Sequence, residues 1–319
     1  MTSPAWTIDL ERHLPAASAA VAPHVVRTPL ERAPRLGERA WIKRETEQHT
    51  GSFKVRGALA ALSAYADEVR ARGAVAASAG NHGLGMAYAA RALGLPVRVY
   101  VPASAARVKV EGIRALGAEI IEVEGVGYDG AEDAALRDAA RTGARFVSPY
   151  DDPYVACGNG GTLRLEVLDA LPECAAIVTP VGGGGLLLGL DAARSARKSV
   201  LRLIGAQSEV SPVMLLSLAR GAAIERFEAA VPTLAEGLEG GVARTTFAHV
   251  RALSALTMVT VSERDLASAM RFARDELGVV LEGSAAVGVA FARAWARHFD
   301  GDLVVLLTGR NVDADRLGD

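Results

Sequence analysis

One lysine stands where its amine could act as a nucleophile. Lys54 opens an apolar, alanine-rich stretch that is typical of a buried helix, in the segment GSFKVRGA (residues 51–58). Ser52 is expected to cap this helix at its N-terminus. The positive end of the helix dipole and partial burial both disfavour an ammonium group, so both favour the neutral amine that Schiff-base chemistry needs. Taken alone, a lysine in such a stretch is more often simply solvated.

A second candidate segment is SAGNHG (residues 78–83), at an expected turn from a strand to a helix. Backbone amides at such a turn form an anion site suited to a carboxylate. The side-chain amide of Asn81 can donate to an oxygen of a ring or of an acid group. The alternative is a plain capping turn, in which His82 serves packing or capping and not proton transfer.

A glycine run, Gly182 to Gly185, follows an apolar strand and leads through Leu186 into a helix expected over 187–196. Glycines let the backbone approach a phosphate closely, and the helix start supplies N–H donors. The run lacks the Gly-Lys-Ser/Thr ending of a Walker loop, and its spacing is one residue off the dinucleotide fingerprint. A phosphate is the expected ligand; a glycine run without any ligand is the alternative.

Two further segments complete the candidate pocket. Thr308, in LTGRN (residues 307–311), is a hydroxyl at the end of a strand, where it can exchange a hydrogen bond with a ring nitrogen. Glu282, in EGSAA (residues 282–286), stands at a helix start with a capping pattern. A threonine that only ends its strand and a glutamate that only caps its helix are the alternatives.

Short apolar segments alternate with alanine-rich helical patterns along the chain. The expected strands are 74–77, 97–101, 119–123, 145–147, 176–181, 201–207 and 302–307, and the expected helices include 82–93, 105–116 and 131–140. This alternation predicts an α/β fold with two open parallel sheets and helices on both faces. We expect residues 73–148 to form a small domain inserted into a larger one, made of 1–72 plus 149–319. In parallel sheets, ligands bind at the loops that follow the carboxyl ends of the strands. The segments 78–81, 182–185 and 308–311 each follow an expected strand, so we expect them to form one pocket.

The composition excludes several classes of protein. The 319 residues include 50% hydrophobic and 23% charged residues, with a net charge of −2, so nucleic acid is not an expected partner. Apolar runs are too short to cross a membrane, and charges near the N-terminus do not fit a signal peptide. The only cysteines are Cys157 and Cys174; they form no metal-ligand cluster or disulfide framework, so a cytoplasmic location and no metal are expected.

In this order, SFKVRGA, ASAGNHG, PVGGGGL, AEGL, EGSAA and LTGRN resemble the fold type II pyridoxal-phosphate (PLP) enzymes. Within them the set resembles the threonine/serine dehydratase branch, which also holds serine racemase. No one motif is decisive, but the ordered set is specific and spans most of the chain. The resemblance implies a tryptophan synthase β-like fold, a large PLP-binding domain, a small domain that closes over the substrate, and a homodimer.

The resemblance also implies roles for individual residues. Lys54 would hold PLP and act as the base at the substrate α-carbon. Around the cofactor, Phe53 would lie against the ring, Asn81 would donate a hydrogen bond to the phenolic oxygen, and Thr308 would face the pyridine nitrogen. The phosphate would be held by Gly182, Gly183, Gly184, Gly185 and Leu186. The pocket would also be lined by Gly237 and Glu282. Ser78, Ala79, Asn81 and His82 would lie in the loop that clasps the substrate carboxylate.

The activity implied is elimination of water and ammonia from a β-hydroxy amino acid, such as L-threonine or L-serine, to give a 2-keto acid. Alternatives within the fold are a dehydratase for 3-hydroxyaspartate, a diaminopropionate ammonia-lyase, a β-replacing synthase and a racemase. The synthase fits less well because ASAGNH replaces TSGNTG. Racemisation fits less well because Ala79 stands where the racemase branch has the serine that acts on the opposite face. Two alternatives lie outside this group of enzymes: a nicotinamide-dependent oxidoreductase and a non-catalytic PLP carrier.

Three positions depart from the family pattern. Arg310 replaces a glycine beside the cofactor nitrogen, where it either steers an acidic group or points to solvent. Gln207 replaces a metal-binding glutamate, so no divalent metal is assigned. The segment CGNGGT (residues 157–162) matches the family's AGQGT only loosely.

Overall fold

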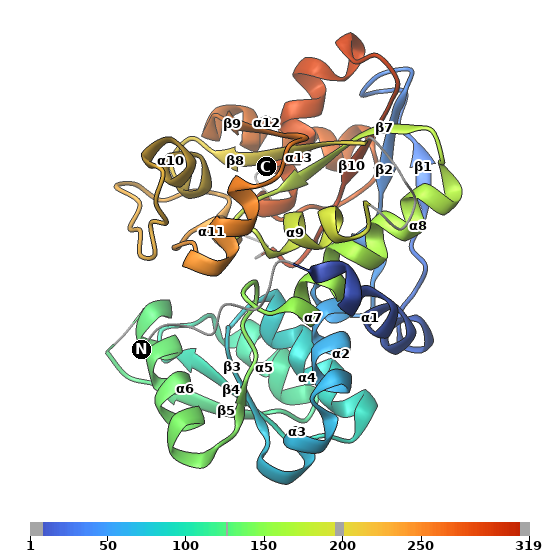
Figure 1. The fold of residues 1–319 in the computed structure, drawn as a ribbon. Helices are drawn as coiled ribbons and strands as arrows, with labels where there is room; N and C mark the ends of the chain where they lie inside the picture. Colours follow the sequence, from blue (N-terminus) through green and yellow to red (C-terminus); the bar gives the residue numbers. More distant parts are fainter. Residues whose placement is uncertain (1–8, 126, 195–200, 313–319) are drawn as a thin grey trace.

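The computed structural model describes residues 9–125, 127–194 and 201–312, which form two separate sheets, one above the other in Figure 1. The six-stranded sheet has the order β1 (Leu30–Arg32), β2 (Ala40–Lys43), β10 (Asp302–Leu306), β7 (Cys174–Pro180), β8 (Arg202–Ser208) and β9 (Leu256–Val261). The four-stranded sheet has the order β5 (Glu119–Val123), β4 (Val97–Pro102), β3 (Ala74–Ala77) and β6 (Arg145–Phe146). Strand β1 pairs antiparallel with β2, and the other pairings among these strands are parallel. The expected α/β class with parallel sheets is confirmed.

Helices surround both sheets (Figure 1). In chain order they are α1 (Leu14–Val21), α2 (Lys54–Ala64), α3 (Ala66–Arg72), α4 (Asn81–Leu93), α5 (Arg107–Ala115), α6 (Tyr128–Thr142), α7 (Pro153–Ala156), α8 (Thr162–Ala170), α9 (Gly185–Ala192), α10 (Val213–Arg220), α11 (Arg244–Arg251), α12 (Glu263–Glu276) and α13 (Gly283–Trp295). Short 3₁₀ turns occur at η1 (Leu10–His13), η2 (Ala22–His24), η3 (Glu45–Glu47), η6 (Glu236–Leu238) and η7 (Ala296–His298). A π-helical turn, η4 (Cys157–Gly161), joins α7 to α8.

Strand β10 shows how the large sheet is buried on both faces. Successive side chains of a strand point to opposite faces. Val304 and Leu306 belong to the core that includes α1, α2, α8 and α9, whereas Leu303 and Val305 belong to a second core under α12 and α13. The first core continues through α2 and α4 to one face of the small sheet. Helix α2, which begins with Lys54, therefore contributes to the hydrophobic core that joins the two sheets.

Each sheet takes its strands from a separate part of the chain. The four strands of the small sheet fall between residues 74 and 146, and those of the large sheet fall outside this interval. Helices α2 and α3 lie on the side of the small sheet in Figure 1, with α2 packed on α4. The division into 1–72 plus 149–319 and 73–148 stays a proposal, in which α2 and α3 reach across to the small sheet.

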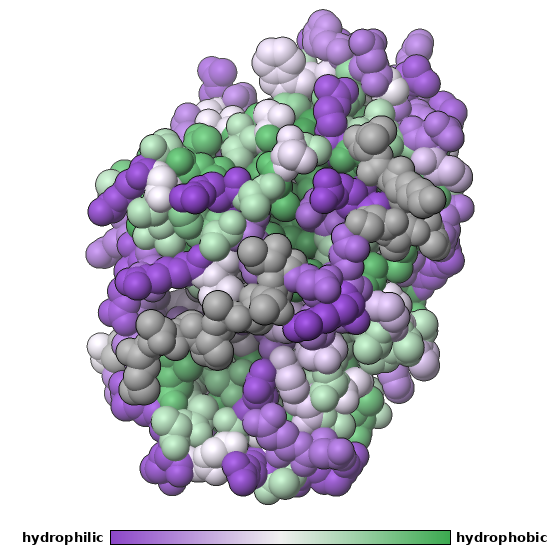
Figure 2. Space-filling view, in the orientation of Figure 1, coloured by the Kyte–Doolittle hydropathy of each residue, from purple (hydrophilic) through white to green (hydrophobic). Residues whose placement is uncertain are grey.

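Polar side chains are prominent on the face of the molecule drawn in Figure 2. Figure 2 shows hydrophilic side chains over much of this face, including the boundary between the upper and lower halves. Among the described residues, no helix has the length and apolar character needed to cross a membrane.

Candidate active site

Lys54 is the first residue of α2, as the sequence predicted, and its side chain is held inside the protein. Its Nζ donates to the carbonyl oxygen of Pro149 at 3.0 Å. Helix α4 packs closely against the backbone of Lys54, since a Cβ on Gly85 would lie 3.0 Å from the Lys54 carbonyl group. The predicted cap is wrong: the helix is preceded by Phe53, and the buried Ser52 Oγ has no hydrogen-bond partner.

Burial changes the acid–base behaviour of this amine. It lowers the pKa of Lys54 to about 8 from an ordinary value of 10.5, and the nearby negative charge of Glu282 opposes the shift only in part. Loss of hydration disfavours the charged form of a lysine in a protein interior. A substantial fraction of Lys54 is therefore neutral, and so nucleophilic, at a pH slightly above neutrality.

Asn81 and Glu282 meet in front of α13. The Asn81 Nδ2 donates to both carboxylate oxygens of Glu282, at 2.8 and 2.9 Å, and Asn81 Oδ1 accepts from Asn311 Nδ2 at 2.6 Å. Glu282 does precede α13, but its side chain does not cap that helix. Burial raises the pKa of Glu282 to about 7, against the bonds from Asn81 and from the Asn311 backbone.

The loop after β3 turns sharply into α4. Ser78 Oγ accepts from the backbone N–H of Gly80 at 3.1 Å, and α4 begins at Asn81 without a side-chain cap. The first N–H groups of a helix have no partner inside it, so this loop presents free donors. Ala79 is half-buried in the same turn.

His82 is buried, and its Nε2 lies 3.0 Å from the carbonyl oxygen of Val147. Burial lowers its pKa to about 3, and the charge of Lys54 adds to the shift. The ring is therefore neutral at physiological pH. It packs from the first turn of α4 against the residue that follows β6 and is not placed to take up a proton near neutrality, in line with the packing role considered from the sequence.

The glycine run forms a tight turn between β7 and α9. A Cβ on Gly183 would lie 2.4 Å from the ring of Tyr150, and Gly184 has φ of +94°, a conformation that favours glycine. Helix α9 begins at Gly185, two residues before the expected start, and includes Leu186. No side chain caps it, so the N–H groups of its first turn are available to an anion.

The end of β10 is tied to the start of α2. The backbone N–H of Phe53 donates to the carbonyl oxygen of Thr308 at 3.0 Å, and Ser52 forms a bridge with Gly309. Thr308 and Phe53 are buried. The Lys54 Nζ lies 5.3 Å from the centre of the Phe53 ring. Thr308 and Lys54 are thus held at one place in the fold.

Arg310 is exposed, and the stem of its side chain covers Gly51. Its backbone N–H donates to the Gly51 carbonyl oxygen at 3.0 Å. Of the two alternatives for Arg310, the structure favours a side chain at the surface over one that lines the pocket.

Gly237 and Gln207 support the site from the large sheet. The N–H of Gly237 donates to Ser284 Oγ at 2.9 Å, which joins η6 to the first turn of α13. Buried Gln207 donates to the carbonyl oxygen of Val181, just before the glycine run, and accepts from Leu215. No group of three or more potential metal-ligating side chains of His, Cys, Asp or Glu occurs within residues 9–125, 127–194 and 201–312.

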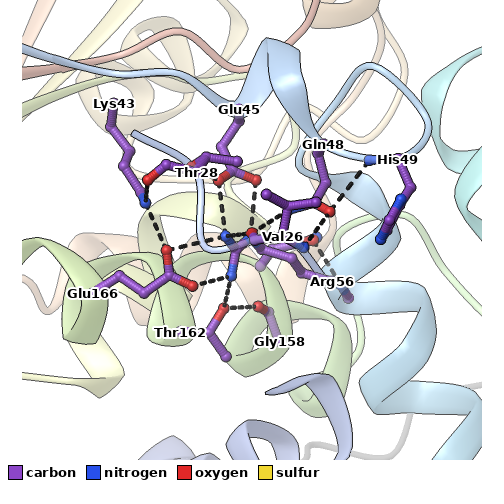
Figure 3. A network of polar contacts seen from close by, with 12 residues as sticks. Val26, Thr28, Lys43, Glu45, Gln48, His49, Arg56, Gly158, Thr162 and Glu166 are labelled. Carbon is purple, nitrogen blue, oxygen red and sulfur yellow. Dashed lines mark hydrogen bonds and ion pairs between the residues drawn. The ribbon is translucent and has the colours of Figure 1, made fainter. Parts of the chain in front are cut away.

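A buried charge network below the start of α2 was not anticipated (Figure 3). The Arg56 guanidinium, fully buried, donates to both oxygens of Glu45 at 2.8 Å and to Glu166 at 2.7 Å. Lys43 also donates to Glu166, at 2.6 Å. Burial opposes ionisation of Glu166, but Arg56 and Lys43 together hold its pKa below the ordinary value. The network fixes α2 to β2 and α8.

Tyr150 was also missed, because its place against the glycine run comes from folding and not from spacing. Asn311 belongs to the LTGRN segment, but its bond to Asn81 cannot be predicted from two positions 230 residues apart. The glycine run itself was the only available signal that some side chain had to pack there.

The residues present fit a PLP cofactor. Lys54 is a buried amine with a lowered pKa, and its partner Pro149 precedes Tyr150, which packs on the glycine turn with its free N–H groups. Ser52 Oγ and His82 Nδ1 are buried and have no hydrogen-bond partner. Such a set suits a ligand that carries a carbonyl group at one end and a phosphate at the other. Fold and site together define a PLP enzyme of the two-sheet α/β type.

Comparison with known proteins agrees. Residues 21–309 match the family model described as pyridoxal-phosphate dependent enzyme, and the chain belongs to this family. An L-threonine ammonia-lyase from Thermotoga maritima is 40% identical over 282 residues, which cover 88% of this chain and 69% of that protein.

Solved structures give the same assignment. The processed form of threonine deaminase isoform 2 from Solanum lycopersicum has a TM-score of 0.88 and 30% identity, and the match covers 99% of this chain and 94% of that one. Maize serine racemase has a TM-score of 0.86 and 30% identity, with 98% and 96% covered. The resemblance noted in the sequence is therefore confirmed, and PLP is the cofactor.

Proposed function

We propose that the chain is a PLP-dependent ammonia-lyase that converts a β-hydroxy amino acid, L-threonine or L-serine, into a 2-keto acid and ammonia. The observation that carries this proposal is the position of Lys54, a buried amine with a lowered pKa, beside the glycine run. Its Nζ donates to the carbonyl oxygen of Pro149, and the next residue, Tyr150, packs on the glycine run. The threonine ammonia-lyase and threonine deaminase relatives support the reaction class.

In this proposal each part of the site has one task. When bound, PLP supplies an electron sink for the charge that develops at the substrate α-carbon. Lys54 Nζ holds the cofactor and then, as a neutral amine, accepts the α-proton. The N–H groups at the start of α9, with Gly182 to Gly185, hold the phosphate. Phe53 and Thr308 would lie beside the cofactor ring, and because both are buried they would exclude water from it.

The substrate is held from the other side. The open N–H groups of the Ser78 to His82 loop receive the carboxylate, as the start of a helix favours an anion. Glu282 and Asn311 orient the Asn81 side chain, and its amide would face the cofactor ring. Ala79 offers no proton donor on the face away from Lys54. Elimination is therefore favoured over racemisation.

The test is a spectrum and an assay of the purified protein beside the Lys54→Ala variant. We expect a visible absorption band that Lys54→Ala alters, and release of keto acid from threonine or serine. Release only from 3-hydroxyaspartate or diaminopropionate would replace the proposed substrate. A band without keto acid from any of these would reject the lyase, and no band after addition of PLP would reject the site.

Two further parts of the proposal concern assembly and location. A homodimer is expected from the resemblance, and sedimentation of the PLP-loaded protein tests it. Cys157 and Cys174 are both buried free thiols, which supports a reducing, cytoplasmic environment. Localisation of the tagged full-length chain in cells tests the compartment.

A further inference from the structure

The π-helical turn η4 (Cys157–Gly161) lies between the two helices whose starts build the cofactor site. All five of its residues are buried. On the α2 side, a Cβ on Gly158 would lie 2.6 Å from the Arg56 carbonyl oxygen and 2.9 Å from the Gly57 Cα. Only a glycine at this position allows the turn and α2 to touch backbone to backbone. Insertions of this kind into helices often occur at functional sites.

The opposite side of η4 contacts α9. A Cβ on Gly160 would lie 2.1 Å from the Leu186 carbonyl oxygen, and one on Gly189 would lie 1.8 Å from the Ala156 carbonyl oxygen. The turn therefore acts as a spacer. On one side it meets the helix that starts with Lys54, and on the other it meets the helix that starts in the glycine run.

Asn159, at the centre of η4, makes the polar link to the Lys54 helix. Its Oδ1 accepts from the backbone N–H of Gly57 at 2.8 Å. Gly57 is the fourth residue of α2, and its N–H would normally donate to the Phe53 carbonyl oxygen one turn earlier. That oxygen accepts from the Arg56 N–H at 3.0 Å instead, and Asn159, from a distant part of the chain, supplies the acceptor for the Gly57 N–H.

A second link holds the turn to the same helix. Thr162 Oγ1 donates to the Gly158 carbonyl oxygen at 2.6 Å and accepts from Arg56 at 3.2 Å (Figure 3). Because Arg56 is also fixed by Glu45 and Glu166, η4 is braced against a rigid part of α2.

We propose that Asn159 is a positioning residue that sets where the Lys54 amine stands relative to the phosphate-binding glycine run. It does so through the Gly57 N–H, with Gly158 and Gly160 allowing contact on the two sides. The proposal rests on the proposed role of Lys54 as the residue that holds PLP. When the link is lost, the first turn of α2 loosens, water reaches Lys54, and the amine moves away from the phosphate site.

The first test compares Asn159→Ala with Asn159→Asp and with Ser217→Ala. Asp keeps an acceptor oxygen for the Gly57 N–H. Ser217→Ala is the matched control, because the buried Ser217 Oγ of α10 donates to the Val213 carbonyl oxygen and accepts from the Ile224 N–H at 3.1 Å, and neither partner belongs to η4 or α2. We expect the dissociation constant of PLP to rise about tenfold in Asn159→Ala, and less than about threefold in the other two.

A second readout follows Lys54 directly in protein freed of PLP. Labelling of its amine against pH, quantified by mass spectrometry, should have its midpoint at about 8 in the wild type. In Asn159→Ala we expect the midpoint to rise by at least about half a unit, because added hydration favours the ammonium form. A purely structural role would lower the melting temperature and leave the midpoint and PLP affinity unchanged, and that result would overturn the proposal.

Two glycine variants keep the test decisive if Asn159→Ala does not fold. Gly158→Ala pushes on the backbone of α2, whereas the added Cβ of Gly161→Ala meets the end of the Leu14 side chain, at 2.5 Å, which can move. We expect Gly158→Ala to weaken PLP binding and Gly161→Ala to leave it within about twofold. Equal effects of both would overturn the proposal.

The role of Lys54 is checked separately. Borohydride reduction of the PLP-loaded wild type, followed by peptide mapping, should find the label on Lys54. A label on another residue would reject the proposed function of Lys54 whatever the Asn159 variants show. A label on Lys54 with unchanged Asn159→Ala behaviour would reject only the positioning role.

Discussion

Asn81 donates its side-chain amide to both carboxylate oxygens of Glu282, at 2.8 and 2.9 Å, across 201 positions of sequence. The contact joins the loop after β3, in the small sheet, to the start of α13, which covers the large sheet. Asn311 then holds the other end of the same amide. The orientation of Asn81 in the site therefore depends on groups from both sheets.

Glu282 should make the stability of the PLP-free protein depend on pH. Its pKa is about 7 when folded and 4.5 ordinarily, so the folded protein binds more protons between these values. The contribution of Glu282 to stability is present below pH 4.5 and is lost as the pH rises through about 7. The melting temperature of Glu282→Gln, relative to the wild type, should increase from pH 5 to 7.5 and then level off. Parallel curves would show that Glu282 does not titrate in this range.

Arg56 should be essential for the stability of α2. Arg56→Met removes the cation between Glu45 and Glu166 and leaves buried carboxylates without it, which costs about 3–5 kcal/mol in comparable cases. The control is Arg70→Met, since Arg70 forms an exposed pair with Asp67 on α3. That change should cost less than about 1 kcal/mol. Urea unfolding of both variants measures the difference, and similar midpoints would contradict the assigned importance of the network.

The sequence could predict the segments of the site because they are local. A glycine run after a strand, a lysine at a helix start and a small polar turn after β3 each carry their own pattern, and the structure places all three at the carboxyl ends of strands or at helix starts. The strands of the small sheet were also found nearly as observed, since each is a short apolar run between helices.

Contacts between residues far apart in the sequence could not be predicted. Ser52 has the residue type of a cap, yet the group that satisfies the Gly57 N–H is Asn159, 102 positions away. Lys43 lies in β2 and is buried, where its ammonium group pairs with Glu166 of α8 and donates to the Thr28 carbonyl oxygen. Strands β1 and β2 were not predicted from the sequence. Strand β1 has only three residues, and β2 ends in the charged side chain of Lys43.

Gly183 should tolerate no larger residue. In Gly183→Ala the new Cβ would lie 2.4 Å from the Tyr150 ring, so the turn must shift away from its position at the start of α9. We expect the dissociation constant of PLP to rise at least about tenfold, with activity partly restored at high PLP. Gly127→Ala is the control, because a Cβ there meets nothing within 4 Å. Fluorescence titration with PLP measures both, and equal affinities would show that the turn does not hold the phosphate.

Ala79 should limit the enzyme to elimination. The α-proton leaves toward Lys54, and return of a proton on the opposite face needs a donor that an alanine methyl group lacks. In the same turn Ser78 Oγ accepts from the Gly80 N–H at 3.1 Å, which fixes the position of that hydroxyl. The wild type incubated with L-serine should yield keto acid without D-serine, whereas Ala79→Ser should form D-serine and retain part of the keto-acid release. Chiral chromatography of timed samples measures both products. D-serine from the wild type would mean that another group reaches the second face, and none from Ala79→Ser would mean that the side chain at position 79 does not face the α-carbon.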